Sequence, residues 1–306
     1  MAQCGFPPVP PGIPAVILAA GRGARLQQRD LPKPLTPLLG LSLLERAVLS
    51  CRQAGVTACY VVVGYAHHCL TPYIAQLAAR YQIPLHAVVN PHWEEGNGTS
   101  VLAVRPYVQG PFLLVMGDHL FDPDILRQLC AAAAQSEACL LAVDRRLHAV
   151  FDLAEATKVR LEGSTLTAIG KTLASFDAVD TGLFFCRPVL FAALAQARAA
   201  GDASLTGGVR QLIGGRQIRA VDIGERFWID VDTPADLRHA ERQLLATLTK
   251  PQEDGPVARH LNRPLSRHLS RYLARTPLHP NHLTLLSSLL SLAAAGLLAL
   301  APSGGE

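Results

Sequence analysis

The chain has 306 residues, enough for one large α/β domain with an attached segment or for two modest domains. Hydrophobic residues make up 49% of it and charged residues only 17%, and the formal net charge is +4. This charge is too small to indicate nucleic-acid binding, and we expect no nucleic-acid partner. The basic residues are concentrated between Arg259 and Arg275, so one short segment is strongly cationic.

The seven cysteines form no C-x-x-C pair and no zinc-ligand spacing. We therefore expect reduced, buried thiols in a cytosolic domain. Residues 1–13 contain proline and glycine but lack a cationic start and an apolar core, so they do not resemble a signal peptide. We interpret them as a flexible leader.

Short apolar runs alternate with helical patterns from Ala15 to about Leu248. The first five expected strands are 15–20, 58–64, 85–90, 112–117 and 138–143, and the helices among them are 43–54, 70–81 and 123–134. Runs of Val, Ile and Leu without alternation are typical of parallel strands buried on both faces. The repetition predicts βαβ units and an α/β fold with a doubly wound, mostly parallel, Rossmann-like sheet.

Beyond Arg145 the pattern changes to short candidate strands at 159–161, 165–169 and 182–185, separated by turn residues. We expect a smaller antiparallel or mixed region over the edge of the sheet that binds ligands. A last strand near 218–223 and a helix at 234–248 would close the domain. We place this domain at residues 14–249.

Three segments are expected after this domain, beginning with a polar linker at 250–257 that contains two prolines. In 258–282 an arginine recurs at every fourth residue from Arg259 to Arg275, and leucines recur two residues out of phase. In a helix these two rows lie on nearly opposite faces, which predicts a basic amphipathic segment at an anionic membrane surface. An ordinary solvated helix packed on the enzyme domain is the alternative.

The run 283–301 is uncharged and nearly reaches the roughly 20 apolar residues that a bilayer span requires. It predicts a transmembrane helix. The arginines precede this run, so the positive-inside rule places the preceding domain on the cytoplasmic side of the inner (cell) membrane. The alternative is the hydrophobic helix of a larger soluble domain.

The most specific motif is L-A-A-G-R-G-A-R at 18–25, followed by K-P-L from Lys33. It follows the first expected strand, where a doubly wound sheet binds ligands at the carboxyl end. Its two glycines would let backbone N–H groups approach phosphate oxygens, while Arg22, Arg25 and Lys33 would supply cations to a triphosphate. The candidate nucleotide-binding residues of the motif are Leu18, Ala19, Ala20, Gly21, Arg22, Gly23 and Lys33.

Other phosphate-binding motifs do not fit this sequence. A dinucleotide fingerprint requires a third glycine where Leu26 stands, and the G-K-T at 170–172 lacks the upstream glycine of a P-loop because position 165 is Thr. A lone G-x-G is a common tight turn, but G-x-G-x-R followed by K-P-L is far more specific. It resembles the superfamily of sugar-phosphate nucleotidyltransferases and cytidylyltransferases, and the resemblance covers roughly residues 14–248.

The resemblance implies a site for Mg²⁺ formed by two aspartates. Asp118 ends the fourth expected strand, and W-I-D-V-D-T-P at 228–234 would supply the second ligand. Asp230 fits that position better and Asp232 is the second choice, whereas Asp236 is expected in the first turn of the last helix. For Asp118 taken alone, an ordinary strand-end turn residue is the alternative. The candidate catalytic residues are Arg25, Lys33 and Asp118.

Two further segments are implied to contact the substrates. Glycines and short polar side chains would approach the base and ribose in the loop of Glu95, Gly96, Asn97, Gly98, Thr99 and Ser100. The alternative there is plain turn chemistry, with Thr99 or Ser100 capping a helix. Lys171 would bind the phosphate of the acceptor, unless it is an ordinary surface lysine. The following acceptor-side residues are Asp180, Thr181 and Gly182.

Four histidines near strand ends lack metal-ligand spacing, and we interpret them as structural or exposed: His67, His68, His119 and His148.

Residues 275–284 resemble the opening of CDP-alcohol phosphotransferases, whose catalytic signature is absent, so the sequence looks like the N-terminal part of a fused enzyme. A cytidylyltransferase joined to such a domain resembles the bifunctional enzymes of di-myo-inositol phosphate synthesis. That resemblance implies CTP and a phosphorylated polyol, inositol 1-phosphate, as substrates, with CDP-inositol and pyrophosphate as products. Phosphocholine or a hexose 1-phosphate as acceptor stays open, as does a non-enzymatic nucleotide-binding relative. The oligomeric state is not indicated.

Overall fold

The structure, a computed structural model, describes residues 6–26, 31–247, 284–285, 287–289 and 291–293. The chain divides into two compact units, Met1–Ala240 and Glu241–Glu306, and the boundary falls inside the helix α7 (Pro234–Thr247). The first unit contains the central sheet and all the candidate site residues.

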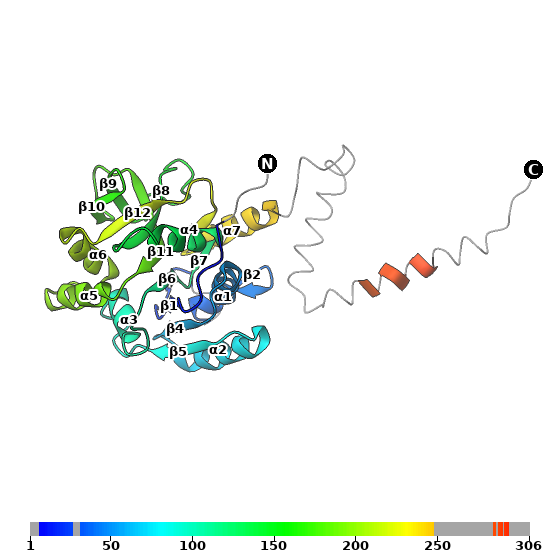
Figure 1. Cartoon of the computed structure of the whole chain (residues 1–306). Coiled ribbons are helices and arrows are strands. Elements are labelled where there is room, and N and C mark those ends of the chain that lie inside the picture. The colour runs from blue at the N-terminus through cyan, green and yellow to red at the C-terminus, as the bar shows by residue number, and fades with distance from the viewer. Residues whose placement is uncertain (1–5, 27–30, 248–283, 286, 290, 294–306) are drawn as a thin grey trace, which may run out of the picture. The chain divides into compact units, whose positions relative to one another are not determined.

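The first unit is built on a nine-stranded sheet with the strand order β5-β4-β1-β6-β11-β8-β12-β10-β9 (Figure 1). Its strands are β1 (Ala15–Ala19), β4 (Cys59–Val63), β5 (Leu85–Val89), β6 (Phe112–Met116), β8 (Cys139–Asp144), β9 (Lys158–Glu162), β10 (Thr165–Gly170), β11 (Ala178–Cys186) and β12 (Ile218–Asp222). Two small sheets pair β7 (His119–Phe121) with β13 (Trp228–Asp230) and β2 (Pro37–Leu38) with β3 (Leu41–Ser42). The other helices are α1 (Leu43–Ala54), α2 (His67–Tyr81), α3 (Asn97–Ala103), α4 (Asp124–Ala133), α5 (Val189–Ala199), α6 (Leu205–Gly214) and the short 3-10 helix η1 (Lys33–Leu35).

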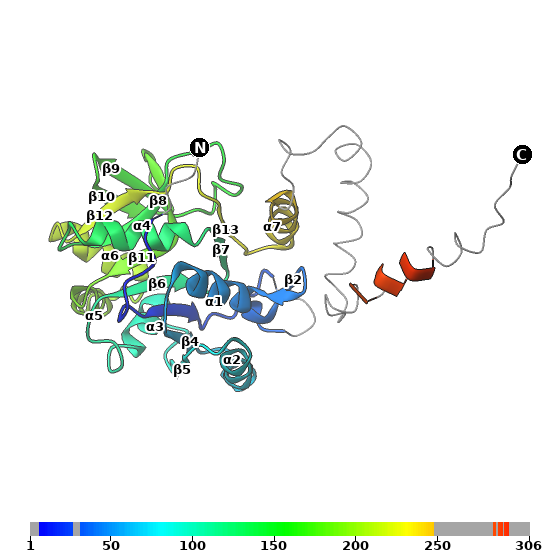
Figure 2. The ribbon, with the colours of Figure 1, turned by 45° about the vertical axis from the view of Figure 1, so that its right-hand side comes forward.

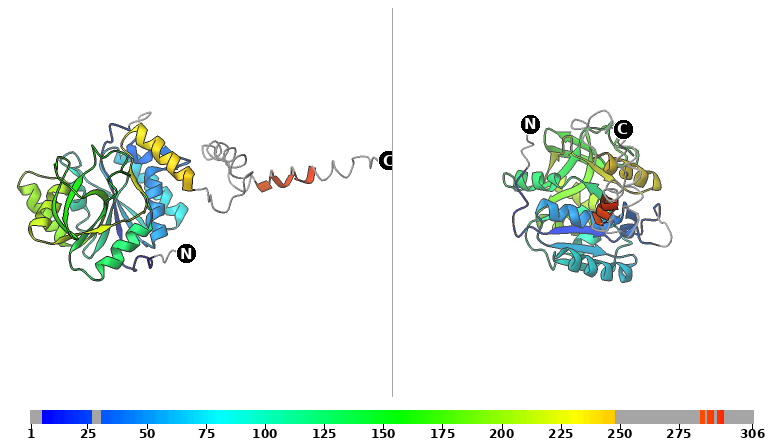
Figure 3. Two further views of the ribbon diagram at one scale, coloured as in Figure 1. Left: turned by 90° about the horizontal axis from the view of Figure 1, so that it is seen from above. Right: turned by 90° about the vertical axis from the view of Figure 1, so that its right-hand side faces the viewer.

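Helices cover both faces of the sheet, as Figures 2 and 3 show. Alternate residues of β1 enter two different cores: Ala15, Ile17 and Ala19 pack with α1, α2 and α4. Val16 and Leu18 pack with α3, α5 and α6 on the other side. A strand buried on both faces needs no polar alternation, which explains the continuous apolar sequence of β1.

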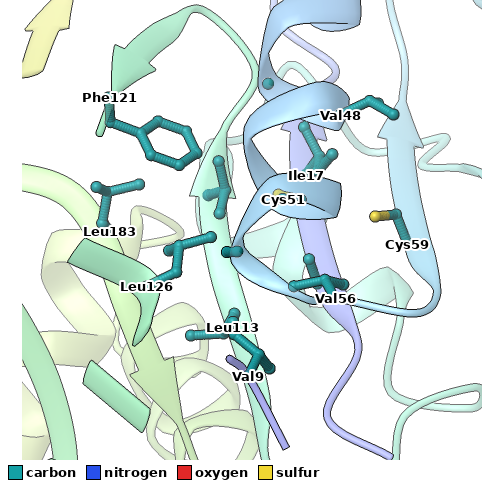
Figure 4. Packing of buried hydrophobic residues seen from close by; sticks show 14 of the residues in the cluster. Val9, Ile17, Val48, Cys51, Val56, Cys59, Leu113, Phe121, Leu126 and Leu183 are labelled. Carbon is teal, nitrogen blue, oxygen red and sulfur yellow. The ribbon is translucent and has the colours of Figure 1, made fainter. Parts of the chain in front are cut away.

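Figure 4 shows the first of these cores, in which Val48 and Cys51 of α1 lie close to Ile17 of β1. Burying an aliphatic side chain such as Val48 or Ile17 completely stabilises the folded state by about 1.5–3 kcal/mol relative to leaving it exposed. The described cysteines are free, and all of them except Cys69 are buried, in line with the expected reduced thiols.

The sheet is mixed, which corrects the expectation of a mostly parallel one. Four neighbouring pairs are parallel (β5–β4, β4–β1, β1–β6 and β8–β12), but β11 runs antiparallel between β6 and β8, and β10 runs antiparallel to β12 and β9. The region beyond Arg145 is therefore part of the main sheet and not a separate layer over it. Because β9, β10 and β11 follow one another without a helix between them, they cannot form parallel crossovers.

Most element boundaries match the sequence-based expectation within one residue. Helix α1 begins and ends as predicted, because Ser42 accepts a hydrogen bond from the N–H of Glu45 (3.0 Å) and Gly55 takes the left-handed conformation. The helices α5 and α6 were not predicted. Helix α5 is apolar almost throughout and shows no clear helical period, whereas α6 has two glycines in its interior, and glycine disfavours a helix.

Part of the expected flexible leader is packed on the first unit. Val9 is buried, and its N–H donates to the carbonyl of Ala54 at 2.9 Å. A bulkier residue at Gly55 would meet Pro8, since a Cβ there would lie 2.9 Å from the proline ring. Residues 6–13 therefore belong to the folded domain.

The described residues include no helix long and apolar enough to cross a bilayer. Of the predicted transmembrane run 283–301, short helical pieces at 284–285, 287–289 and 291–293 are described, and in them Leu285, Leu289 and Leu292 are exposed. The rest of this run, with the expected linker 250–257 and basic segment 258–282, lies outside the described residues.

Candidate active site

A cavity of about 370 Å³ opens at the carboxyl ends of β1 and β6. Eight of the predicted site residues line it: Leu18, Ala19, Gly21, Gly23, Arg25, Lys33, Asp118 and Asp232. The two strands are parallel neighbours, so their ends place the loop after β1 beside the turn after β6. This is where open α/β sheets bind ligands.

The two glycines of the loop after β1, Gly21 and Gly23, lie in different surroundings. Gly23 has φ +62°, and a Cβ there would lie 2.3 Å from the Cβ of Lys33, so a side chain would displace the lysine. Gly21 has open space around the position of a Cβ, which leaves its backbone accessible from the cavity. Arg22 does not line the cavity, because its guanidinium lies over the ring of Tyr65 at 5.8 Å.

Lys33 is the centre of a buried charge cluster. Only 6% of its side chain is exposed, and its Nζ donates to Asp118 Oδ2 at 2.5 Å and to Asp232 Oδ1. Asp230 Oδ1 lies 4.0 Å from the same nitrogen. Burial lowers the pKa of Lys33, but the three carboxylates outweigh it and raise the pKa above its usual range. The lysine is therefore charged.

Asp118 lies in the turn between β6 and β7. Burial raises the pKa of this carboxyl, but Lys33 and His119 more than offset it and hold the pKa well below its usual range. Its Oδ1 lies 2.9 Å from Nδ1 of His119, whose ring stacks on Trp228 of β13 at 6.1 Å. Asp118 is therefore ionised and held from two sides.

Asp118, His119 and Asp230 each offer a ligand atom, and these atoms lie within 4.8 Å of one another. Asp230 Oδ1 is buried and makes no hydrogen bond within the described part of the chain, and burial raises the pKa of Asp230 to about 6. Carboxylate oxygens are the ligands that Mg²⁺ prefers. The residues present thus fit a divalent cation, which would satisfy the unpaired oxygen.

The neighbouring Asp232 is engaged differently. Its Oδ2 accepts from the Arg25 guanidinium at 2.5 Å, and its Oδ1 accepts from Lys33. Asp236 lies in the first turn of α7 as expected, and its carboxylate accepts from the backbone N–H groups of Asp232 and Thr233. Asp236 therefore fixes the backbone that carries Asp232.

His119 is a site residue that the sequence analysis missed, because it was judged by spacing to other histidines. It is buried beside Asp118 and Asp230, and the surrounding carboxylates overcome the effect of burial and raise its pKa to about 9. Its place directly after Asp118 was the available signal. The other three histidines, His67, His68 and His148, are exposed.

On the expected acceptor side, Lys171 is 57% exposed, and its Nζ lies 3.4 Å from Glu155 Oε2. The same oxygen lies 3.3 Å from Arg25 at the cavity. Asp180 is half-buried, and this burial raises its pKa to about 6, while its carboxylate accepts from the N–H of Gly182.

The two residues after Asp180, Thr181 and Gly182, are buried in the protein interior. Thr181 is fully buried and donates to the carbonyl of Ala142 at 2.8 Å. Gly182 has φ +72°, and a Cβ there would lie 2.8 Å from Nε2 of His119. These residues support the position of His119.

The loop 95–100 does not line the cavity. Glu95 pairs with Arg198 of α5, and the Asn97 side chain accepts from the N–H of Leu205 at 2.8 Å. Gly96 and Gly98 lie against the backbone of Ala203, where a Cβ at either position would approach its carbonyl oxygen to 2.6 Å.

The end of this loop is buried and enters α3, whose N-cap is Gly96. The side-chain amide of Asn90 donates to the hydroxyls of Thr99 (2.9 Å) and Ser100 (3.0 Å), so neither hydroxyl caps the helix. The side chains of the loop thus hold α3 against the start of α6.

Comparisons with known proteins identify the class to which this fold and site belong. Residues 15–221 match the MobA-like NTP transferase domain, and the chain belongs to this family of nucleotidyltransferases. It is 41% identical over 295 residues to the "Bifunctional IPC transferase and DIPP synthase" of Rubrobacter xylanophilus, covering 94% of this chain and 64% of that protein. It is 31% identical to the protein of the same name from Thermococcus kodakarensis, covering 92% and 62%.

The chain therefore spans less than two thirds of the length of these relatives. Among solved structures, the inositol-1-phosphate CTP transferase from T. maritima is similar with a TM-score of 0.68 and 25% identity. That similarity covers 78% of this chain and 96% of the other.

Proposed function

We propose that this chain is a CTP:inositol-1-phosphate cytidylyltransferase, which forms CDP-inositol and pyrophosphate and supplies the synthesis of di-myo-inositol phosphate. The observation that carries the proposal is the cavity around Lys33, in which the glycine loop meets Asp118 at the carboxyl ends of β1 and β6. The similarity to the inositol-1-phosphate CTP transferase supports the choice of base and acceptor.

The proposed reaction is an in-line displacement. A phosphate oxygen of inositol 1-phosphate attacks the α-phosphorus of CTP, and the bond from this phosphorus to the bridging oxygen of the β-phosphate breaks, so that pyrophosphate leaves. Asp118 and Asp230 would hold Mg²⁺, with Asp232 as a second choice for the latter, and the ion would neutralise charge on the phosphates. Positioning and electrostatics would supply the catalysis, without a covalent intermediate.

The loop after β1 would bind the triphosphate. Gly21, Gly23 and Arg25 line the cavity, where the backbone N–H groups of the loop and the guanidinium of Arg25 would bind phosphate oxygens. The buried Lys33 would keep the carboxylates of Asp118 and Asp232 at a fixed separation and add positive charge near the phosphates. Arg22 and Ala20 would contribute through the backbone of the loop.

The remaining candidate residues would act around this centre. The loop 95–100 would approach the base and ribose through its backbone, because its side chains hold α3 and α6 together. Lys171 would bind the acceptor phosphate, and Asp180–Gly182 would support the acceptor side next to His119.

Pyrophosphate release over a panel of nucleotides and acceptors tests the assignment. We expect the highest turnover with CTP, inositol 1-phosphate and Mg²⁺. A preference for UTP or dTTP with a hexose 1-phosphate would refute the assigned substrates and leave the class intact. Turnover with phosphocholine in place of inositol 1-phosphate would refute the acceptor alone.

A membrane attachment is the second element of the proposal. The basic segment 258–282 would lie on an anionic lipid surface and the run 283–301 would span the bilayer, with the enzyme domain on the cytoplasmic side. The exposed leucines at 285, 289 and 292 support an apolar environment for this run. Such an anchor would keep CDP-inositol close to a membrane enzyme that consumes it. Membrane fractionation tests it.

A further inference from the structure

Glu155 occupies a position between two cations that belong to different parts of the site. It lies in the connection between β8 and β9, and a single oxygen, Oε2, is 3.3 Å from the guanidinium of Arg25 and 3.4 Å from Nζ of Lys171. Arg25 lines the cavity, and Lys171 is the cation proposed for the acceptor phosphate. The carboxylate therefore bridges Arg25, on the proposed triphosphate side, and Lys171, on the proposed acceptor side, and the acceptor's phosphate would bind between these two cations.

The backbone around this bridge is held by Lys158. Its Nζ donates to the carbonyl of Ala154 (3.0 Å) and to the carbonyl of Lys171 (2.8 Å). Lys158 thus connects the backbone of Ala154, the residue before Glu155, to the backbone of Lys171. The N–H of Glu155 also donates to the side chain of Asp152 at 3.3 Å.

The carboxylate itself is free to leave without disturbing that backbone. The side chain of Glu155 is 54% exposed, and within the described residues its carboxylate forms these two ion pairs. Exposed ion pairs are weak and exchange readily with other anions. The backbone that carries Glu155 is therefore held in place, while its carboxylate can be displaced from Arg25 and Lys171 by another anion.

We propose that the Glu155 carboxylate stands in for the acceptor's phosphate in the free enzyme and thereby restricts the acceptor to dianionic phosphate monoesters. This inference rests on the proposed function. A phosphate monoester brings about two negative charges and three oxygens to Arg25 and Lys171, against one charge from Glu155. A monoanion, such as a phosphodiester or a carboxylate, gains no charge by replacing it. Glu155 thus acts as a specificity-determining residue.

The variant Glu155→Gln keeps the size of the side chain and removes its charge. We expect the apparent Michaelis constant for the acceptor to fall about three- to tenfold. This is the size of effect that two weak, exposed ion pairs competing with the substrate would produce. The Michaelis constant for CTP and the maximal rate should stay within about twofold of wild type, because Arg25 keeps its ion pair with Asp232 (2.5 Å) in the variant. Acetate, a monoanion, should become a competitive inhibitor against the acceptor in the variant but not in wild type, at constant ionic strength.

Glu162→Gln is the matched control, because Glu162 is an exposed glutamate on the neighbouring β9 with no described contact to the site. A rise in the acceptor constant of Glu155→Gln would overturn the proposal, since it would show that Glu155 orients Arg25 and Lys171 for substrate. An unchanged constant, or an equal change in Glu162→Gln, would overturn it as well.

The test uses whichever phosphate monoester supports pyrophosphate release in the panel, so an incorrect acceptor assignment does not affect it. If no monoester supports turnover in wild type, the proposed function fails. The inference is then decided by calorimetry with inorganic phosphate and acetate. Tighter binding of acetate to Glu155→Gln than to wild type supports it, and equal binding overturns it.

Discussion

Two groups of charges in the same site differ in their exposure and hence in their role. In the group around Lys33, 6% of the lysine side chain is exposed, and the three carboxylates within 4.0 Å of its Nζ have between 29% and 43% of their side chains exposed. The group of Arg25, Glu155 and Lys171 has between 51% and 57% of each side chain exposed. Breaking a buried ion pair costs about 3–5 kcal/mol, whereas an exposed pair contributes about 0.2–1 kcal/mol. The group around Lys33, at the proposed cation site, is therefore held more rigidly than the exposed group of Arg25, Glu155 and Lys171.

The largest effect is expected from Asp118→Asn, which removes the charge paired with the buried Lys33 without a change of volume. Turnover should fall by at least about 100-fold, which corresponds to about 2.7 kcal/mol of activation free energy. Steady-state kinetics at saturating Mg²⁺ measures it, with circular dichroism to confirm the fold and Glu162→Gln as the control. Near-normal activity would show that Asp118 does not hold the cation.

Lys33→Met tests whether the buried lysine balances the carboxylates. Without Mg²⁺ the free energy of unfolding should fall by about 3–5 kcal/mol, because three carboxylates lose their common counter-charge. Mg²⁺ should recover part of this loss, since an ion that binds only the folded state stabilises it. Denaturant unfolding with and without Mg²⁺ measures both values. An equal loss of unfolding free energy with and without Mg²⁺ would show that Lys33 does not belong to the cation site.

Lys171→Ala concerns the exposed group and should have a smaller effect. The apparent constant for the acceptor should rise about tenfold, equivalent to about 1.4 kcal/mol, while that for CTP changes little. Separate saturation curves for the two substrates measure this. Arg160→Ala, which removes an exposed cation from β9, is the control. A rise in the CTP constant alone would place Lys171 on the nucleotide side.

The smallest effect on turnover is expected from removal of residues 258–306. All candidate site residues precede this segment, so the truncated chain should retain the turnover of the full chain, whereas the full chain alone should fractionate with membranes. In sealed vesicles with the cytoplasmic side outward, added protease should digest the enzyme domain. Recovery of the full chain in a high-salt supernatant without detergent would contradict the anchor.

The sequence allowed most of the individual elements to be predicted, but not the direction of every strand. Apolar runs in the sequence predict buried strands such as β1 and β4, and cap residues with an amphipathic pattern predict α1. Strand direction depends on which strands become neighbours. The strand β11 inserts between β6 and β8 through backbone hydrogen bonds to residues far away in the chain, and no local pattern encodes that choice.

The sequence by itself determined the class of the site, because the glycine loop, Lys33 and Asp118 are short motifs whose chemistry is local. Only the tertiary structure decided how they meet. It brought Asp230 together with Asp118 and His119, and it placed Asp232 against Lys33 and Arg25. Strand pairing between β7 and β13 sets this geometry, since it puts residue 230 opposite residue 119, over 100 positions away. The bridge of Glu155 to Arg25 likewise spans 130 positions. Contacts at such separations arise from the packing of the sheet, which a local sequence pattern does not contain.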